Sequence, residues 1–455
     1  MKNRPRLMIL TLVLYAGYAV FLAAVFQPRG WGLLYFFIPL GVYETGLRLW
    51  MRKKFGKYYR YAIFNYLMVD HPVYGFAFRK NSESKKIPFP IFDKFAFRAG
   101  VEPSVDLKEN IAGRVDFDIN SLGFRGPEFS LQKKDPNMIR IFASGDSTTA
   151  CAMVGNDEAW PAVLEKELRG RGVNAEVINA GVGAWSSYQE WLRFEREIIN
   201  YQPDIVLLNQ GWNEEFWFSA QNLGRNWQPK QLLGAVEMKT MYARVGSILS
   251  STASLFLHFL AASYYYDHRF KKNMDFNNPD RWQCLKRTEY LQNWFDNMIN
   301  FAQRAQSNNI KLYTVNAPGL VSMEDSPAER QLYIKSTKLT EIYADYQAAS
   351  RQRLRETLLA AHAIIPCIDV ETEMSKQRGQ SRRDLFIDKI HLNPKGNALL
   401  ASIVCDALLS DKRFYGKDTN LAFDNTAVKN IRDQIGVNDE SLNGFIDSRI
   451  KQLKC

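Results

Sequence analysis

Five short apolar runs separated by long helical patterns occupy the chain between residues 138 and 410. The runs have the length and composition of buried strands, and the segments between them repeat apolar residues with a helical period. Parallel strands need long crossover connections, so this alternation predicts βαβ units and one parallel sheet with helices on both faces. The expected strands are Ile139–Ala143, Ala175–Asn179, Ile205–Asn209, Lys311–Asn316 and Ile364–Asp369. The expected helices are Glu158–Arg169, Ser187–Asn200, Glu289–Ser307, about Lys338–His362 and Lys395–Leu409.

Two apolar segments near the N-terminus predict a membrane anchor over residues 1–60. Residues 7–26 contain no charged side chain, and a helix of this length spans about 30 Å, the thickness of a bilayer core. A second apolar run extends over about 31–50, with Glu44 and Arg48 near its end. We expect a transmembrane helical hairpin; the alternative is one spanning helix followed by a segment that lies in the membrane interface.

Positive charge is concentrated directly after the second apolar run. The chain has 59 Lys and Arg against 48 Asp and Glu, a net charge of +11, which suits either nucleic acid or an anionic membrane surface. A basic cluster beside a membrane helix is expected to contact anionic headgroups, so we expect a membrane and no nucleic acid as partners. With both segments spanning, the remaining chain is expected on the cytoplasmic side; with only the first spanning, it is periplasmic or extracellular. The cluster comprises Arg48, Arg52, Lys53, Lys54, Lys57 and Arg60.

Three further parts are expected around or within the α/β domain of residues 138–410. Residues 61–137 are irregular and contain several prolines, which is typical of a linker or a small β-rich cap. Residues 216–282 interrupt the alternation as an insertion, and their apolar stretch 245–266 predicts a lid helix or a membrane-facing surface. Residues 411–455 have a charged helical pattern and are expected to form a C-terminal helical extension. The sequence leaves the identity of any protein partner open.

Four polar motifs follow the predicted strands or precede the last predicted helix. Loops at the carboxyl ends of parallel strands meet at one edge of the sheet, where α/β folds bind their ligands. The first motif, taken alone, also suits a helix N-terminus with Asp146 or Ser147 as the N-cap. The motifs are Ser144–Thr149 (SGDSTT), Asn179–Ser186 (NAGVGAWS), Asn209–Glu214 (NQGWNE) and Asp388–Gly396 (DKIHLNPKG).

Together the motifs contain the groups that acyl transfer through a serine requires. Ser147 supplies a hydroxyl nucleophile, and His391 is a base with a pKa near neutrality. Asp388, three residues earlier, can hold the other imidazole nitrogen and stabilise the imidazolium. Oxyanion donors are expected from the Ser147 amide, an amide of the Gly183–Ala184 turn and the Asn213 side chain.

The order and placement of the four motifs resemble those of the SGNH (GDSL-like) hydrolases over about residues 138–410. The resemblance implies a flavodoxin-like three-layer α/β/α domain and ester hydrolysis or acyl transfer through a serine. Residue by residue, Ser147 matches the family's nucleophile and Asn213 its side-chain oxyanion donor. Asp388 and His391 match its acid–base pair.

Two positions depart from the family pattern. Ala184 stands where the second motif usually has glycine, with Gly183 one position earlier. Because the donor there is a backbone amide, alanine can serve. Glu214 stands where the third motif commonly has aspartate, which leaves the role of the neighbouring asparagine intact.

The expected activity is that of a membrane-anchored serine esterase or deacetylase acting on acyl or acetyl esters. The resemblance suggests esters of a carbohydrate or a lipid. The alternatives are an O-acyltransferase of an envelope polysaccharide using the same residues, and an inactive SGNH-like binding or scaffold protein. We expect no cofactor and no metal, because no two histidines are spaced as ligands with a nearby acid. The five cysteines form no CxxC pair, which argues against a zinc ribbon and a disulfide framework.

Overall fold

The computed structural model describes two compact units of the chain, residues 1–66 with 238–263 and residues 67–237 with 264–455. In the first unit it describes the helical residues 41–46 and 49. In the second unit the described residues are 68–82, 116–151, 153–214, 275–287, 289–316, 318–337, 340–376, 381–416, 425–435 and 439–454.

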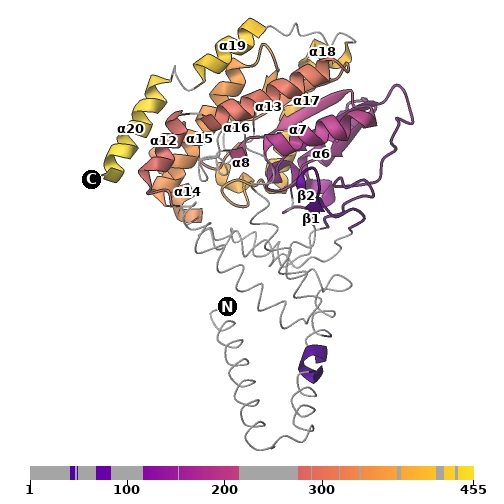
Figure 1. Ribbon diagram of the computed structural model, residues 1–455, viewed down its shortest axis with the longest axis horizontal. Helices are drawn as coiled ribbons and strands as arrows, with labels where there is room; N and C mark the ends of the chain where they lie inside the picture. The colour runs from indigo at the N-terminus through magenta and orange to yellow at the C-terminus, as the bar shows by residue number, and fades with distance from the viewer. Residues whose placement is uncertain are drawn as a thin grey trace, which may run out of the picture. The chain divides into compact units, whose positions relative to one another are not determined.

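A five-stranded parallel sheet forms the centre of the second unit (Figure 1). Its order is β4-β3-β5-β6-β7, which is 2-1-3-4-5 when the strands are counted from β3, the flavodoxin-like order. The register pairs Gly145 with Asn209 and Ala143 with Asn179, so the first three motifs leave the sheet at the same edge. The strands are β3 (Ile139–Gly145), β4 (Ala175–Asn179), β5 (Ile205–Asn209), β6 (Lys311–Val315) and β7 (Cys367–Ile368).

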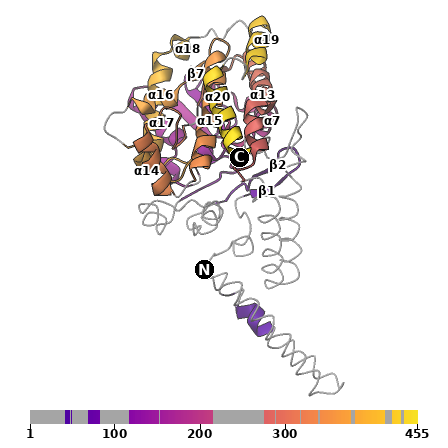
Figure 2. The same cartoon turned by 90° about the vertical axis from the view of Figure 1, so that its left-hand side faces the viewer.

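Helices cover both faces of the sheet and enclose two apolar cores (Figure 2). Alternate strand residues face opposite cores, as the two-residue period of a strand requires: Phe142 lies in one core, and Ile141 and Ala143 lie in the other. The first core is closed by α7 (Ser187–Arg196), α13 (Glu289–Gln306) and α15 (Glu341–Ala360). The second is closed by α6 (Trp160–Gly170) and α17 (Pro394–Ser410). The predicted α/β fold with a parallel sheet is confirmed.

The last strand is shorter than predicted, because only Cys367–Ile368 of the expected Ile364–Asp369 pairs with β6. Ile364 and Ile365 lie in the turn after α15, where their amides bind the Ala361 carbonyl. Pro366 has no N–H to donate to the sheet, although its carbonyl accepts the Thr314 N–H at 2.8 Å. The apolar run is therefore buried without being a strand along its whole length.

Helix ends differ from the predictions where capping groups set them. The helix expected from Lys338 begins at Glu341, because the Thr340 side chain caps it by accepting the Tyr343 N–H at 3.3 Å. The helix expected from Glu158 begins at Trp160, after a separate 3₁₀ turn at Asn156–Glu158. The helix expected to end at Asn200 ends at Arg196 and is followed by a 3₁₀ helix, Ile198–Tyr201.

Residues 68–82 form a hairpin that packs on the second motif, in a region predicted as a linker or β-rich cap. Its strands are β1 (Met68–His71) and β2 (Gly75–Phe78), paired antiparallel. The Trp185 indole N–H donates to the Phe76 carbonyl at 2.9 Å, and the Gln189 side chain donates to the Tyr74 carbonyl at 2.8 Å. This part of the chain is therefore joined to the α/β domain by specific hydrogen bonds.

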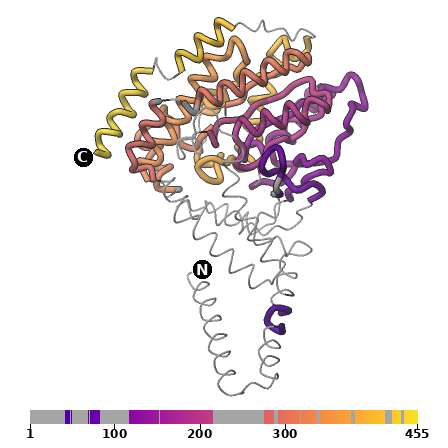
Figure 3. Tube along the Cα trace, viewed as in Figure 1, coloured from indigo at the N-terminus to yellow at the C-terminus, as the bar shows by residue number. Residues whose placement is uncertain are grey.

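The described residues after Ser410 are largely helical and continue the domain, and the tube in Figure 3 shows the last helix, in yellow, beside α12. Lys286 of α12 pairs with Asp447 at 2.7 Å, and Arg353 of α15 donates to Asn443 at 2.6 Å. The buried Asp345 pairs with both Arg330 and Arg449. The remaining helices are α5 (Ser147–Ala150), α8 (Trp212–Glu214), α12 (Pro279–Arg287), α14 (Pro327–Thr337), α16 (Val370–Ser375), α18 (Lys412–Tyr415), α19 (Asn425–Gln434) and α20 (Glu440–Lys454).

The predicted membrane segments 7–26 and 31–50 lie outside the described residues, apart from 41–46 and 49. The apolar stretch 245–266 of the insertion also lies outside them. Among the helices that the structure describes, none combines the length and apolar character needed to cross a bilayer.

Candidate active site

Ser147 is the first residue of α5, directly after the carboxyl end of β3. The preceding turn requires glycine, because a Cβ at Gly145 would lie 2.3 Å from the Asn209 carbonyl oxygen. Asp146 is the N-cap of α5, and its carboxylate accepts the Thr148 N–H at 2.8 Å. The N-cap role therefore belongs to Asp146, and the hydroxyl of Ser147 faces the fourth motif.

The fourth motif places an imidazole and a carboxylate in line with this hydroxyl. The Ser147 Oγ lies 3.0 Å from Nε2 of His391. Nδ1 of the same ring lies 2.8 Å from Oδ2 of Asp388, and the other oxygen, Oδ1, accepts the backbone N–H groups of Ile390 and His391 at 2.7 Å each. With its Nδ1–H donated to the carboxylate, the imidazole presents Nε2 as the acceptor for the serine proton.

The electrostatics of this pair favour a charged imidazole. Burial acts to raise the pKa of Asp388, but the adjacent His391 and the two backbone N–H groups lower it to about 2. Burial acts to lower the pKa of His391, but the Asp388 carboxylate, with a smaller contribution from Asp146, raises it above its ordinary value. The imidazolium that forms on proton transfer is thus stabilised.

The second and third motifs meet beside the serine. The Asn213 amide donates one N–H to the Trp185 carbonyl at 2.8 Å, which orients the amide and leaves its second N–H for a ligand. Ala184 has φ of 66°, a left-handed conformation that favours glycine. The family's usual glycine at this position thus has a conformational reason, and alanine adopts the same conformation here.

Comparison with known proteins identifies the family. A model of the GDSL-like Lipase/Acylhydrolase family matches residues 143–399, which include Ser147, Asn213, Asp388 and His391. The chain belongs to this family. Comparison of the chain with functionally curated proteins gives no match.

Several solved structures are similar to part of this chain. Axe2, an acetylxylan esterase from Geobacillus stearothermophilus, is 14% identical over 59% of this chain and 93% of its own, with a TM-score of 0.33. A GDSL-like lipase from Bacteroides thetaiotaomicron is 16% identical over 59% of this chain and 86% of its own, with a TM-score of 0.29.

The geometry at Asn213 predicts the effect of removing its side-chain amide. We expect Asn213→Ala to lower kcat by about 10²- to 10³-fold with little change in KM, because an oxyanion donor acts mainly in the transition state. Steady-state kinetics with p-nitrophenyl acetate measure both constants. An exposed asparagine, Asn308→Ala, is the control. A change confined to KM would show that Asn213 binds the ground-state ester instead.

Arg125 is a buried residue of the site region that the sequence analysis did not identify. Its guanidinium donates to the carbonyls of Ala150, Cys151 and Val154 at 2.5, 2.6 and 2.7 Å, which closes the loop after the serine-bearing helix. Burial lowers the pKa of Arg125 to about 10, so the side chain is charged at neutral pH. Its place between two glycines predicts a turn but not burial, and no local pattern signals this contact.

We expect Arg125→Met to lower the free energy of unfolding by about 3 kcal/mol, because buried carbonyls lose their donors. Urea unfolding followed by circular dichroism measures this value. Arg196→Met is the matched control, since the Arg196 side chain is 65% exposed, and it should change the free energy by less than about 0.5 kcal/mol. Equal stabilities for the two variants would contradict the role assigned to Arg125.

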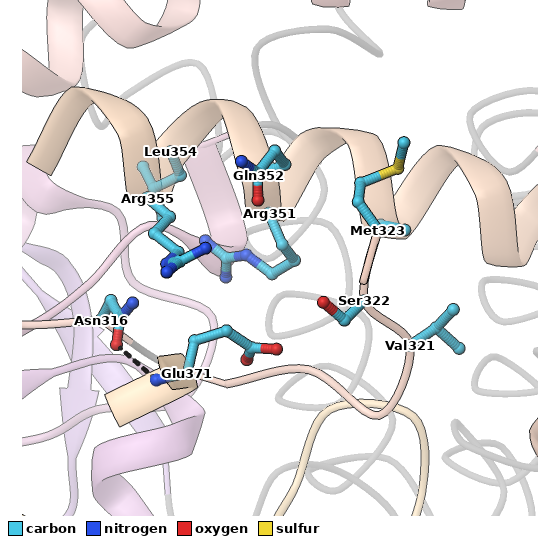
Figure 4. Close-up of a pocket in the computed structure, with 10 residues that line it drawn as sticks. Asn316, Val321, Ser322, Met323, Arg351, Gln352, Leu354, Arg355 and Glu371 are labelled. Carbon is cyan, nitrogen blue, oxygen red and sulfur yellow. Dashed lines mark hydrogen bonds between the residues drawn. The ribbon is translucent and has the colours of Figure 1, made fainter. Parts of the chain in front are cut away.

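A separate small pocket lies between α15 and the loop after β6 (Figure 4). Arg351 and Arg355 point into it from α15, toward Glu371 (Figure 4). Its charged groups bind one another or nearby side chains: Arg355 pairs with Asp369 at 3.0 Å, and Glu371 pairs with Arg382 at 2.5 Å. The first pair joins α15 to the N-cap residue of α16, and the second joins α16 to the 3₁₀ helix Arg382–Leu385. We assign no ligand to the pocket.

Arg351 of α15 stacks on the Trp212 ring, 4.0 Å from its centroid, so this indole packs against a helix next to the oxyanion asparagine. The aromatic residues 216–218 and 264–266 of the insertion lie outside the described residues. Within the described ranges, no three His, Cys, Asp or Glu side chains are grouped as metal ligands.

Proposed function

We propose that the protein is a serine ester hydrolase whose catalytic residues are Ser147, His391 and Asp388. The observation that carries the proposal is the continuous line of contacts from the serine Oγ to Nε2, 3.0 Å, and from Nδ1 to the aspartate Oδ2, 2.8 Å. Membership of the GDSL-like acylhydrolases supports the same reaction class.

In the proposed reaction the Ser147 Oγ attacks the ester carbonyl carbon as Nε2 of His391 accepts the hydroxyl proton. The negative charge on the carbonyl oxygen is stabilised by the Asn213 amide and by backbone amides of Ser147 and the Gly183–Ala184 turn. Collapse of the tetrahedral intermediate breaks the bond to the alcohol, which takes the proton from His391 and leaves an acyl-serine. Water then attacks the acyl-serine and releases the acid by the same proton transfers in reverse.

The proposed substrates are acyl or acetyl esters of a carbohydrate or a lipid. An O-acyltransferase would use the same acyl-serine and differ only in the second step, where an acceptor hydroxyl replaces water.

We also propose that residues 1–60 anchor the chain in a membrane, with the catalytic domain on the cytoplasmic side. A reporter fused after Lys454 that is active only when exported tests this orientation, because its activity would place the domain on the other side.

Labelling of the full-length protein with a fluorophosphonate probe tests the catalytic proposal. We expect one adduct, located on Ser147 by mass spectrometry of the proteolytic peptides, and none in Ser147→Ala. The same preparation is then given p-nitrophenyl acetate with and without a carbohydrate acceptor. Release of free acetic acid indicates hydrolysis, and acetylation of the acceptor indicates acyl transfer. An unlabelled serine in a protein that unfolds cooperatively would instead support a binding or scaffold role.

A further inference from the structure

Glu214, one residue after the oxyanion asparagine, joins the third motif to the second. Its carboxylate is 1% exposed and accepts the backbone N–H of Ser187, the first residue of α7. The neighbouring Asn213 donates to the carbonyl of Trp185. Consecutive residues of one loop therefore bind both ends of the segment that follows Ala184.

The surroundings of Glu214 are polar but contain few charges. Two acidic residues lie near Glu214: Glu190 of α7, and Asp146 directly after β3. Each of them is 1% exposed. From α13, the Asn297 amide donates to the hydroxyl of Ser187 at 3.0 Å. Two further charged groups, Arg351 of α15 and His391 of the fourth motif, act to lower the pKa of Asp146. The Glu214 carboxylate accepts the Ser187 N–H, and the backbone and hydroxyl of Ser187 both act to lower the pKa of Glu214.

We propose that Glu214 is a positioning residue of the oxyanion site, whose ionised carboxylate holds Ser187 and thereby fixes the Gly183–Ala184 turn relative to Asn213. The inference rests on the proposed function, because it assigns this turn an oxyanion donor. A carboxylate–amide hydrogen bond is roughly twice as strong as a neutral one and is further favoured at a helix N-terminus. The turn needs such support, because Ala184 is held in a conformation that alanine rarely adopts.

The proposal predicts a specific pH dependence. Burial raises the pKa of Glu214 to about 7 against the lowering effect of the Ser187 N–H, with Asp146 adding to the rise. Ionised Glu214 therefore accumulates as the pH rises through neutrality, as does neutral His391, whose pKa is also raised. If both groups must lose a proton, log kcat/KM should rise with a limiting slope of two on the acid side.

The Glu214→Gln variant removes the charge and keeps the shape. We expect kcat to fall by about ten- to a hundredfold, with KM changed less than twofold, and the acid-side slope to fall from two to one. Glu190→Gln is the matched control: burial, together with Glu214 and Asp146, raises the pKa of Glu190 well above its usual range, so glutamine imitates its protonated form. This control should keep the wild-type kcat and slope.

Hydrogen–deuterium exchange tests the contact without requiring turnover. The peptide that contains Ser187 should exchange on the order of tenfold faster in Glu214→Gln than in the wild type, and at the wild-type rate in Glu190→Gln. The proposal would be overturned by unchanged exchange in Glu214→Gln or by a retained slope of two in that variant. Equal losses of kcat in Glu214→Gln and Glu190→Gln would also overturn it. A wild type that exchanges as expected but hydrolyses no ester would reject the proposed function and the oxyanion role, while leaving the contact itself established.

Discussion

Replacing Ser147 with alanine is expected to lower kcat/KM for ester hydrolysis by on the order of 10⁴- to 10⁶-fold. Without the hydroxyl no acyl-enzyme forms, and the remaining rate comes from water attacking an ester bound beside the oxyanion donors. His391→Ala should cost a similar factor, because the serine hydroxyl, 3.0 Å from Nε2, then has no base to accept its proton. The double variant should be no worse than the singles, since the two residues act as one unit.

Two controls separate this loss from a general effect of substitution. Ser307→Ala removes an exposed hydroxyl that donates to the Gln303 carbonyl at 3.0 Å, and His362→Ala removes an exposed imidazole. Both should keep kcat/KM within about twofold of the wild type. Rates near the wild-type value in Ser147→Ala would reject the nucleophile, and a double variant showing the product of the two single losses would reject their joint action.

The meeting of the motifs was predictable because it follows from the topology of the sheet. Strands that run parallel end at one edge, so residues far apart in the chain, such as Ser147 and Asn213, are brought to one side by the fold itself. His391 lies before a helix whose N-cap, Asn393, is evident from the sequence, and that helix packs on the second core. Strong periodicity therefore predicted most of the fold, and the parallel topology predicted the order of the site.

The features that were not predicted depend on tertiary contacts. Nothing local distinguishes Arg125 from a solvent-exposed arginine in a turn; its burial depends on carbonyls about 25 residues away. In the sequence, Glu214 is a substitution in the family motif with no evident consequence. Its role follows only from the hydrogen bond that it accepts from the Ser187 N–H. Ala184 shows its strain only as a backbone dihedral angle. In each case a polar or conformational requirement is met by a distant segment, which a pattern along the chain cannot show.

The Asp388→Asn variant is expected to lower kcat by on the order of 10⁴-fold while leaving the fold and KM nearly unchanged. The reason lies in how this side chain is held: Oδ1 accepts two backbone N–H groups at 2.7 Å, from Ile390 and His391. An asparagine must keep its oxygen there and turn its NH₂ group toward Nδ1. The imidazole then carries its proton on Nε2, the wrong nitrogen, and cannot accept the proton of Ser147.

A pH profile distinguishes this change of tautomer from simple damage to the site. Loss of the carboxylate removes the charge that raises the pKa of His391, so the acid limb of the remaining activity should move to lower pH. Asp384→Asn, an exposed position of the preceding 3₁₀ helix Arg382–Leu385, is the matched control and should keep both the rate and the profile. If Asp388→Asn kept kcat within about tenfold of the wild-type value, the rate would not depend on the imidazole tautomer. Asp388 would then act only as a turn residue that caps the loop.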